Sequence, residues 1–371
     1  MTHPTSLIIR AGPKAMATIR SEGLRPEQVA VIPGAAGGPK ALGIIGLDSA
    51  IFGEWLPRAT RIRDLIGVSI GAWRFAAVCR GDVPAALKDF GDIYCGQRYP
   101  LHPSTRLVSE SAHANTRQLL EGREAAVLAN PHYRLHVIAT RGRRLLAEQS
   151  PIRTPAGFAG AALVNAFGRQ HLRHLADRMW FHDARGMPAF LRIAGDDNTT
   201  KRETSHDFDR FRTLTASLNT DNLHPALWAT AAIPTVMDGV ENIPGAPPGT
   251  YWDGGIIDYH LHLPYHRADG ITLYPHFTDQ IIPGWLDKPM PWRRACGQWL
   301  ENLVLVSPSP EYLASLPHQK LPDRSDFKRF EHDGDAREKY WRRTMAESER
   351  MGEEFIRLAE SGEISARLQP L

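Results

Sequence analysis

The sequence predicts an α/β fold with a central, mostly parallel sheet flanked by helices. Short buried strands at Gln28–Ile32 and Ile62–Ile66 are each followed by a glycine-containing loop and then by a helix. Consecutive strand–loop–helix units form right-handed crossovers in parallel sheets. Such sheets hold their sites at the carboxyl ends of the strands, so both loops are expected at one edge of the sheet.

The first loop, Pro33–Lys40, leads into a stretch with apolar residues at helical spacing, Ala41–Phe52. It superficially resembles a phosphate-binding loop, but Pro39 stands in place of the required glycine and Ala41 in place of the Ser or Thr. A nucleotide site is therefore not expected. The unobstructed backbone N–H groups of Gly37 and Gly38 suit a developing oxyanion instead. The alternative is a tight turn.

The second loop centres on Ser69 in Gly67-Val68-Ser69-Ile70-Gly71, between a strand and a helix. This is the pattern of a nucleophile elbow, in which Gly67 and Gly71 permit a sharp turn that exposes the serine hydroxyl at a helix N-terminus. Three fixed letters are a weak signal by themselves, and an ordinary glycine-rich turn is the alternative. The strand before the motif and the helix after it favour a nucleophile.

Asp253 is the candidate base for Ser69. It begins Asp253-Gly254-Gly255, after a short aromatic strand at Tyr251-Trp252. An Asp beside two glycines is commonly a turn. Its position downstream of the serine motif favours a carboxylate that the flexible glycine pair allows to approach Ser69. Partial desolvation would be needed to raise its pKa and make it a competent base.

Together, these stretches resemble the patatin-like phospholipase family. The family's oxyanion motif with a basic residue is similar to Gly37-Gly38-Pro39-Lys40, its Gly-x-Ser-x-Gly to Gly67–Gly71, and its Asp-Gly-Gly to Asp253–Gly255. The segment Ala229–Thr235 is similar to the family's small-residue Ile-Pro segment. The resemblance covers about residues 28–264, in the family's order.

The resemblance implies a patatin-like three-layer fold and a Ser-Asp dyad that needs no metal or organic cofactor. Ser69 would attack an ester carbonyl of a phospholipid or related acyl lipid. Asp253 would take the serine proton and return it to the leaving alcohol, while the amides of Gly37 and Gly38 hold the oxyanion. Water would then release the fatty acid from the acyl-enzyme. The supporting positions are Lys40, Gly67, Gly71, Gly254 and Gly255.

The chain departs from the family's pattern around these motifs. Ala41 replaces a usual glycine, and Trp73 is a bulky residue just past the elbow that is expected to narrow or redirect the acyl pocket. Where the family tends towards Asn and Pro, this chain has Asp258, His260 and His262. These departures leave the particular acyl ester or thioester open.

Two other functions fit the same motifs. An α/β-hydrolase with a full triad has the chain order Ser, Asp, His. Its candidate histidines are His260, His262, His266 and His276. The other alternative is a protein of the same fold that binds lipid or a partner without turnover.

Composition excludes several classes of protein. The 371 residues are 42% hydrophobic and 23% charged, with a net charge of +3 and no nucleic-acid-binding motif. The three cysteines are interpreted as free thiols. The first residues lack the features of a signal peptide, which predicts a cytoplasmic protein. Contact with a membrane surface and the oligomeric state stay open.

We expect a single domain over residues 1–371, with a core at about 28–310, a helical insertion at about 80–180 and a helical extension at about 311–371. Residues 155–182 run from apolar to basic, which favours a core-facing helix with a solvated face over a membrane-surface helix. The seven-residue spacing of three tryptophans favours one buried helix face over a lipid interface. They are Trp285, Trp292 and Trp299. Asp335–Ser361 is interpreted as a charged, solvated helix.

Overall fold

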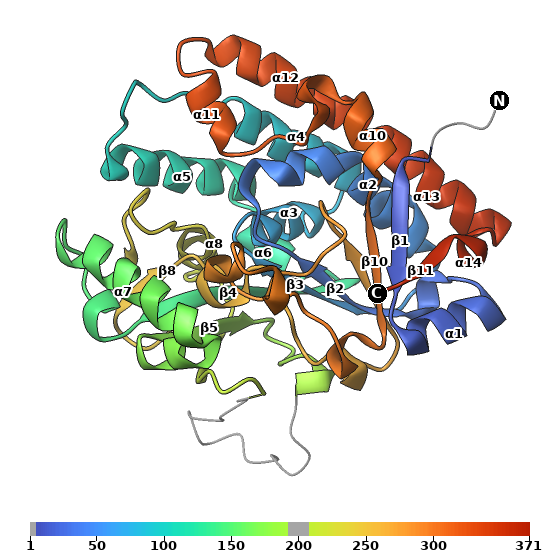
Figure 1. The fold of residues 1–371 in the computed structure, drawn as a ribbon, viewed down its shortest axis with the longest axis horizontal. Coiled ribbons are helices and arrows are strands. Elements are labelled where there is room, and N and C mark those ends of the chain that lie inside the picture. The colour runs from blue at the N-terminus through green and yellow to red at the C-terminus, as the bar shows by residue number, and fades with distance from the viewer. Residues whose placement is uncertain (1–4, 192–207) are drawn as a thin grey trace.

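A large mixed sheet with helices packed around it organises the computed structural model, which describes residues 5–191 and 208–371 (Figure 1). Within those residues the strand order is β11-β1-β10-β9-β2-β3-β4-β5-β6, and β8 joins β4 to β7. The strands are β1 Leu7–Ala11, β2 Val29–Gly34, β3 Arg63–Val68, β4 Tyr133–Gly142, β5 Ala176–His182, β6 Thr213–Ser217, β7 Val240–Glu241, β8 Thr250–Trp252, β9 Ile271–Pro275, β10 Leu303–Pro308 and β11 Leu368–Pro370.

The middle of the sheet is parallel. Neighbouring strands run in the same direction from β10 through β9, β2 and β3 to β4. Antiparallel pairs occur towards the sides, where β1 meets β10 and β4 meets β5 and β8. The predicted α/β class with a mostly parallel sheet is therefore confirmed.

Helices flank the sheet. Most of the longer helices connect strands of the sheet along the chain or belong to its C-terminal part (Figure 1). The α-helices are α1 Pro13–Glu22, α2 Ile45–Ala50, α3 Ile70–Val78, α4 Val83–Cys95, α5 Thr105–Leu120, α6 Glu124–Leu128, α7 Arg153–Phe167, α8 Leu223–Thr230, α9 Gly255–Asp258, α10 Pro310–Ser315, α11 Ser325–Arg329, α12 Gly334–Glu347, α13 Glu349–Ser361 and α14 Ile364–Arg367.

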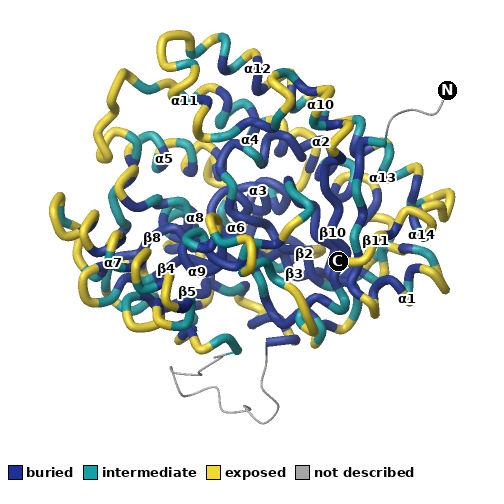
Figure 2. Tube along the Cα trace, viewed as in Figure 1, coloured by how far each residue is buried: buried dark blue, intermediate teal, exposed yellow. Residues whose placement is uncertain are grey.

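The two glycine loops leave the sheet side by side, as predicted. In the register of β2 and β3, Gly34 lies opposite Gly67, so both strands end at the same edge. Every residue of α3, the helix that follows Ser69, is buried, and Figure 2 shows it deep in the molecule. A central strand followed by a fully buried helix gives the turn between them little freedom to move.

The main hydrophobic core draws on the chain from Leu7 to Leu368. A smaller cluster, which includes Phe158 and Trp252, packs between α7 and the end of β8. The expected core at residues 28–310 therefore also uses side chains on both sides of that range. Residues 80–180, expected as a helical insertion, contribute strands β4 and β5 to the sheet as well as helices.

The prediction of one core-facing helix over residues 155–182 is wrong. The chain there forms α7, then a 3-10 helix over Arg169–His174, and then β5. Arg178, interpreted from its sequence context as a solvated basic residue, lies in β5 with its side chain buried between Asp209 and Asp258, at 2.7 and 2.6 Å. Burial between two carboxylates lets an Arg occupy an interior strand position.

The interpretation of the tryptophans as one buried helix face is also wrong. The segment consists of separate 3-10 helices at Trp285–Asp287, Pro291–Arg293 and Gln298–Leu300, and the Trp292 side chain is 78% exposed. Prolines and glycines between these turns prevent a continuous helix, because they interrupt its hydrogen bonds.

The charged segment Asp335–Ser361 differs from its prediction in two ways. It forms the two helices α12 and α13, and it buries one face of each, including Trp341 and Phe355. Figure 1 shows these red helices lying over α4 and α2. The N–H of Gly46 in α2 donates to the Ser348 hydroxyl at 2.7 Å. The many charged residues of the outer face make this segment read as solvated in the sequence. The apolar residues at helical spacing nevertheless pack both helices against the rest of the protein.

In the described residues, no helix is both long enough and apolar enough to cross a membrane.

Candidate active site

Ser69 occupies a strained turn between β3 and α3. Its backbone has φ 53° and ψ −127°, a conformation that costs a non-glycine residue about 1–3 kcal/mol. The flanking glycines are required because a Cβ on Gly67 would lie 2.4 Å from Ala72 Cα, and a Cβ on Gly71 would lie 2.0 Å from the Gly34 carbonyl oxygen. The sequence motif is therefore explained by close packing of two backbones.

Thr230, at the end of α8, holds this turn from the other side. The Ser69 N–H donates to Thr230 Oγ1 at 2.8 Å, and the Thr230 hydroxyl donates to the carbonyl oxygen of Ile138 in β4. Sequence reasoning missed this positioning residue. The available signal was its place in the small-residue segment Ala229–Thr235.

Ser69 and Asp253 are in direct contact. The Ser69 hydroxyl donates to Asp253 Oδ2 at 2.8 Å. The other carboxylate oxygen, Oδ1, accepts from the N–H of Gly255 at 2.7 Å. The Asp253 backbone N–H donates to the Ala232 carbonyl oxygen at 2.8 Å, and a Cβ on Gly254 would lie 2.2 Å from the Ile138 carbonyl oxygen. The two glycines thus allow the carboxylate to reach the serine.

The environment of Asp253 makes it a stronger base than an exposed carboxylate. The residue is only 6% exposed, and burial raises its pKa above the ordinary 3.8. The positive charge of Arg324 and hydrogen bonds from Gly255 and Ser69 oppose this rise. The net result is a raised pKa, as a carboxylate that accepts a proton from serine needs.

The Gly37-Gly38 loop lies beside this pair. Gly37 packs against Phe277, whose ring would lie 2.4 Å from a Cβ on Gly37, and Gly38 has a positive φ of 57° and borders the same cavity as Ser69. The amide of Ile70, at the start of α3, is a further donor that sequence reasoning missed, although any residue after a nucleophile is a candidate. Within residues 5–191 and 208–371, the amides of Gly37, Gly38 and Ile70 have no hydrogen-bond acceptor.

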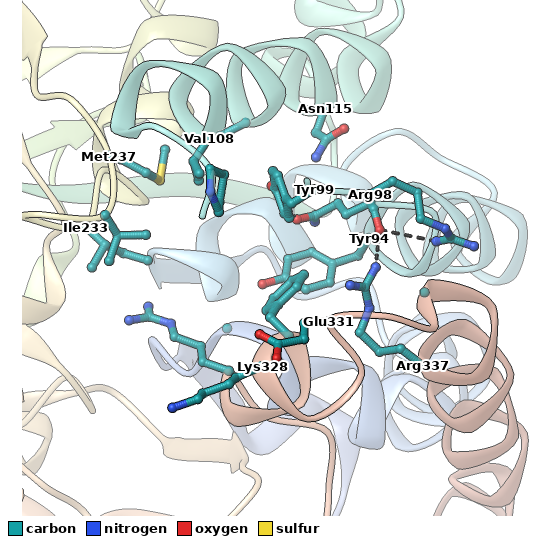
Figure 3. A pocket seen from close by; sticks show the side chains of 18 of the residues that line it. Tyr94, Arg98, Tyr99, Val108, Asn115, Ile233, Met237, Lys328, Glu331 and Arg337 are labelled. Carbon is teal, nitrogen blue, oxygen red and sulfur yellow. Dashed lines mark hydrogen bonds between the residues drawn. The ribbon is translucent and has the colours of Figure 1, made fainter. Parts of the chain in front are cut away.

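Ser69 lines a cavity of about 680 Å³. Figure 3 shows this cavity from close by. Helix α5 lies on one side of it and α11 and α12 on the other, and Figure 3 shows Val108 of α5 across from Lys328 and Arg337. Apolar side chains form much of its wall. They include Trp73, Val108, Ala112, Ile233, Met237 and Phe327.

Trp73 borders the cavity, with its indole N–H donating to the Leu227 carbonyl oxygen at 2.7 Å. The segment 155–182 contributes no residue to this wall. The C-terminal residues do, including Phe327, Phe330 and Arg337. No local motif indicates this, because the contact depends on how α11 and α12 pack against the rest of the chain.

Lys40 lies outside the cavity wall. Its ammonium group is 5.2 Å from the centroid of the Phe277 ring, and burial lowers its pKa. Lys40 therefore packs on the ring that supports the Gly37-Gly38 loop, and it places a positive charge near the site.

The histidines considered for a triad lie elsewhere. His260 and His276 pack together with ring centroids 4.3 Å apart, and His260 Nδ1 lies 3.1 Å from the Ile282 nitrogen. His262 packs on Trp299, and His266 lies in a 3-10 helix at Tyr265–Arg267. Among the described residues, no histidine forms a hydrogen bond with Ser69 or Asp253.

Within residues 5–191 and 208–371, no three or more His, Cys, Asp or Glu side chains are arranged to hold a metal ion. No protein-family model matches the chain, and no curated protein matches it at a significant level.

Proposed function

We propose that the chain is a serine lipid acyl hydrolase of the patatin-like type, with the corresponding three-layer fold, which cleaves carboxylic ester bonds through an acyl-enzyme. The observation that carries the proposal is the 2.8 Å hydrogen bond from the Ser69 hydroxyl to the buried Asp253 carboxylate at the cavity floor. A serine next to a base with a raised pKa is an activated nucleophile.

In the proposed mechanism, Ser69 Oγ attacks the ester carbonyl carbon while its proton moves to Asp253 Oδ2. The amides of Gly37, Gly38 and Ile70 stabilise the negative charge on the carbonyl oxygen. When the tetrahedral intermediate collapses, the bond to the leaving alcohol breaks and Asp253 returns the proton to it. A water molecule then attacks the acyl-enzyme with Asp253 as base, which releases the carboxylic acid and restores Ser69.

The cavity supports an acyl chain as the bound group. Its volume of about 680 Å³ is in the range of small-molecule sites, and its wall near Ser69 includes Trp73, Ile233 and Met237. Apolar surface of this kind stabilises a hydrocarbon chain by about 0.8 kcal/mol per buried methylene group. Longer acyl chains are therefore expected to be better substrates until the cavity is filled.

The position of the histidines favours a dyad over a triad, since Asp253 contacts the serine directly. The strained Ser69 backbone favours an enzyme over a silent binding protein. Backbone conformations that cost free energy cluster at functional sites, where the strained geometry is part of the mechanism.

The test is hydrolysis of p-nitrophenyl esters of graded chain length, together with labelling by a fluorophosphonate probe. Wild-type protein should be labelled and should prefer longer chains. Ser69→Ala should lose labelling, and both Ser69→Ala and Asp253→Asn should lose about 10³-fold or more in kcat/KM. Thermal denaturation should show that both variants are folded.

The matched controls are Ser49→Ala, a partly exposed serine of α2, and Asn substitutions of His260 and His276. Retention of activity in all three agrees with a dyad. Loss of nearly all activity in one folded histidine variant would support the triad instead. A wild type without labelling or turnover would support the binding protein.

A further inference from the structure

Arg324, which immediately precedes α11, lies against the proposed oxyanion loop. Its Nε would be 3.3 Å from a Cβ on Gly38. The residue borders the main cavity together with Ser69, and also a small adjoining cavity together with Asp253 and Tyr259. A guanidinium group is thus placed at the reacting end of the site, where the apolar wall ends.

Two lysines lie nearby, each over an aromatic ring. Lys288 Nζ lies 4.1 Å from the ring centroid of Tyr259, which lines the small cavity with Arg324. Lys40 Nζ lies 5.2 Å from the centroid of Phe277, the ring that packs on Gly37. Arg324 therefore lies directly against the Gly37-Gly38 loop, while Lys40 and Lys288 lie behind rings that pack on the loop or line the small cavity.

Within residues 5–191 and 208–371, none of these three cations forms an ion pair with a carboxylate. Two acids interact with these cations through their charge without forming an ion pair: Asp253 with Arg324 and Lys288, and Asp323 with Lys40. Asp323 is paired with Lys320 at 2.8 Å, and Asp253 accepts from Ser69. The buried Arg178, by contrast, has two carboxylate partners. One buried carboxylate and one carboxylate that is already paired do not neutralise three cations, and like charges repel.

Lys288 is subject to this repulsion, which the charge of Asp253 only partly opposes. Its pKa is lowered to about 8, chiefly by burial and then by the charges of Arg324 and Lys40. A bound anion would relieve this repulsion and restore the charged form. Aromatic faces compensate a cation by only about 0.5–2 kcal/mol, so Tyr259 and Phe277 do not replace an anion.

We propose that Arg324 forms an anion subsite beside Ser69, with the charges of Lys40 and Lys288 held nearby over the Phe277 and Tyr259 rings, and that this subsite selects acyl esters carrying a phosphate or carboxylate group close to the ester bond. This inference rests on the proposed hydrolase function. Arginine suits the role because its planar fork of donors matches the oxygens of both anions. The acyl chain occupies the apolar cavity, and the anionic part of the leaving group faces Arg324.

The test compares substrates that differ only in charge. One pair is 1-octanoylglycerol 3-phosphate and 1-octanoylglycerol, and the other is octanoyloxyacetate and octanoyloxyacetamide, with octanoate release measured at neutral pH. The anionic member should have a KM about 10- to 100-fold lower, as expected for charge-assisted hydrogen bonds. Preference in the first pair alone identifies a phosphate site, and preference in both identifies a general anion site.

Arg324→Met should remove this preference by raising KM for the anionic ester about 10-fold or more relative to its neutral partner. Because Arg324 also lowers the pKa of Asp253, both members of a pair are compared at the same pH, so that an effect on the base cancels from their ratio. Arg324→Lys should restore part of the preference, and Lys288→Met should weaken it. The control is Lys339→Met, which removes an exposed charge from α12, away from the cavity wall.

A binding experiment separates failure of the subsite from failure of the hydrolase function. Calorimetric titration of the Ser69→Ala variant with the phosphate-bearing and neutral octanoylglycerols needs no turnover. Tighter binding of the phosphate form, lost in Ser69→Ala/Arg324→Met, supports the subsite even if no ester is hydrolysed.

Two outcomes would overturn the proposal. One is equal binding of the charged and neutral ligands by the Ser69→Ala variant. The other is an Arg324→Met variant in which kcat falls equally for both members of each pair. That result would mean that Arg324 acts on the oxyanion or on Asp253 and not on a substrate anion.

Discussion

At the Ser69 turn the backbone has no spare volume, whereas across the cavity the C-terminal segment is held by large side chains. Gly71 and Gly34 pack backbone to backbone, and a single methyl group at Gly71 would overlap the Gly34 carbonyl. The opposite wall depends on Trp341, which is fully buried against Phe327 and Arg337. The turn is therefore held by close packing of backbones, and the wall by contacts between large side chains.

This difference has a functional meaning. Chemistry at a serine needs atoms placed to within a fraction of an ångström, which backbone packing and the Thr230 hydrogen bond supply. Accommodation of an acyl chain needs only apolar surface of suitable shape, which side chains on α5, α11 and α12 supply. Damage to the wall should therefore change stability and chain-length preference, whereas damage to the turn should stop the reaction.

The largest stability effect is expected from Trp341→Ala, which should lower the free energy of unfolding by about 3–5 kcal/mol because it leaves a cavity behind Phe327. At temperatures where the variant is folded, Ser69 should still react with a fluorophosphonate, while turnover of octanoyl esters falls relative to acetyl esters. Urea denaturation and ester kinetics measure both effects. The control Trp292→Ala, at a 78% exposed side chain, should change stability by less than about 0.5 kcal/mol. Equal effects of the two substitutions would contradict the comparison.

Gly71→Ala should destabilise by about 3 kcal/mol and lower kcat/KM about 100-fold or more, because the methyl group displaces either the Ser69 turn or the Gly34 loop. Gly160→Ala is the matched control. Gly160 lies inside α7, and no atom of another segment comes within 4 Å of the place that a methyl group would occupy, so this substitution should stabilise by about 0.5–1 kcal/mol. A fully active Gly71→Ala variant would show that the turn is less constrained than its packing indicates.

Thr230→Val should have an intermediate effect of about 1–2 kcal/mol on stability, because it leaves the Ser69 N–H and the Ile138 carbonyl without their partner. Activity should fall about 10-fold as the turn loses its anchor. Thr230→Ser keeps the hydroxyl and should restore most of both. If valine and serine behave alike, the hydrogen bond has no role in positioning Ser69.

The smallest change is a shift in pH dependence. Asp253 must be ionised to accept the Ser69 proton, so kcat/KM should fall as pH falls through its pKa, about tenfold per pH unit below it. Because burial raises that pKa, the inflection should lie above the ordinary carboxyl value of 3.8. Circular dichroism over the same range should show intact structure. An inflection at or below 3.8 would mean that Asp253 is solvated or is not the base.

The sequence alone determined those features that depend on residues close together in the chain. The strand–glycine–helix units predicted the parallel centre of the sheet, and Gly67–Gly71 and Asp253–Gly255 predicted the two side chains that meet at 2.8 Å. These predictions succeed because a tight turn needs particular residues at particular spacings, and such requirements are visible in a few consecutive letters.

Only the tertiary structure decided what surrounds that pair. The segment 155–182 became a helix and a strand because Asp209 and Asp258 allow Arg178 to be buried, and neither acid is near it in the sequence. Likewise, Arg324 and Phe327 line the cavity because α12, which follows them in the sequence, packs its buried face on α4 and α2. Contacts of this kind follow from the sum of many weak packing interactions between distant segments, which no local pattern records.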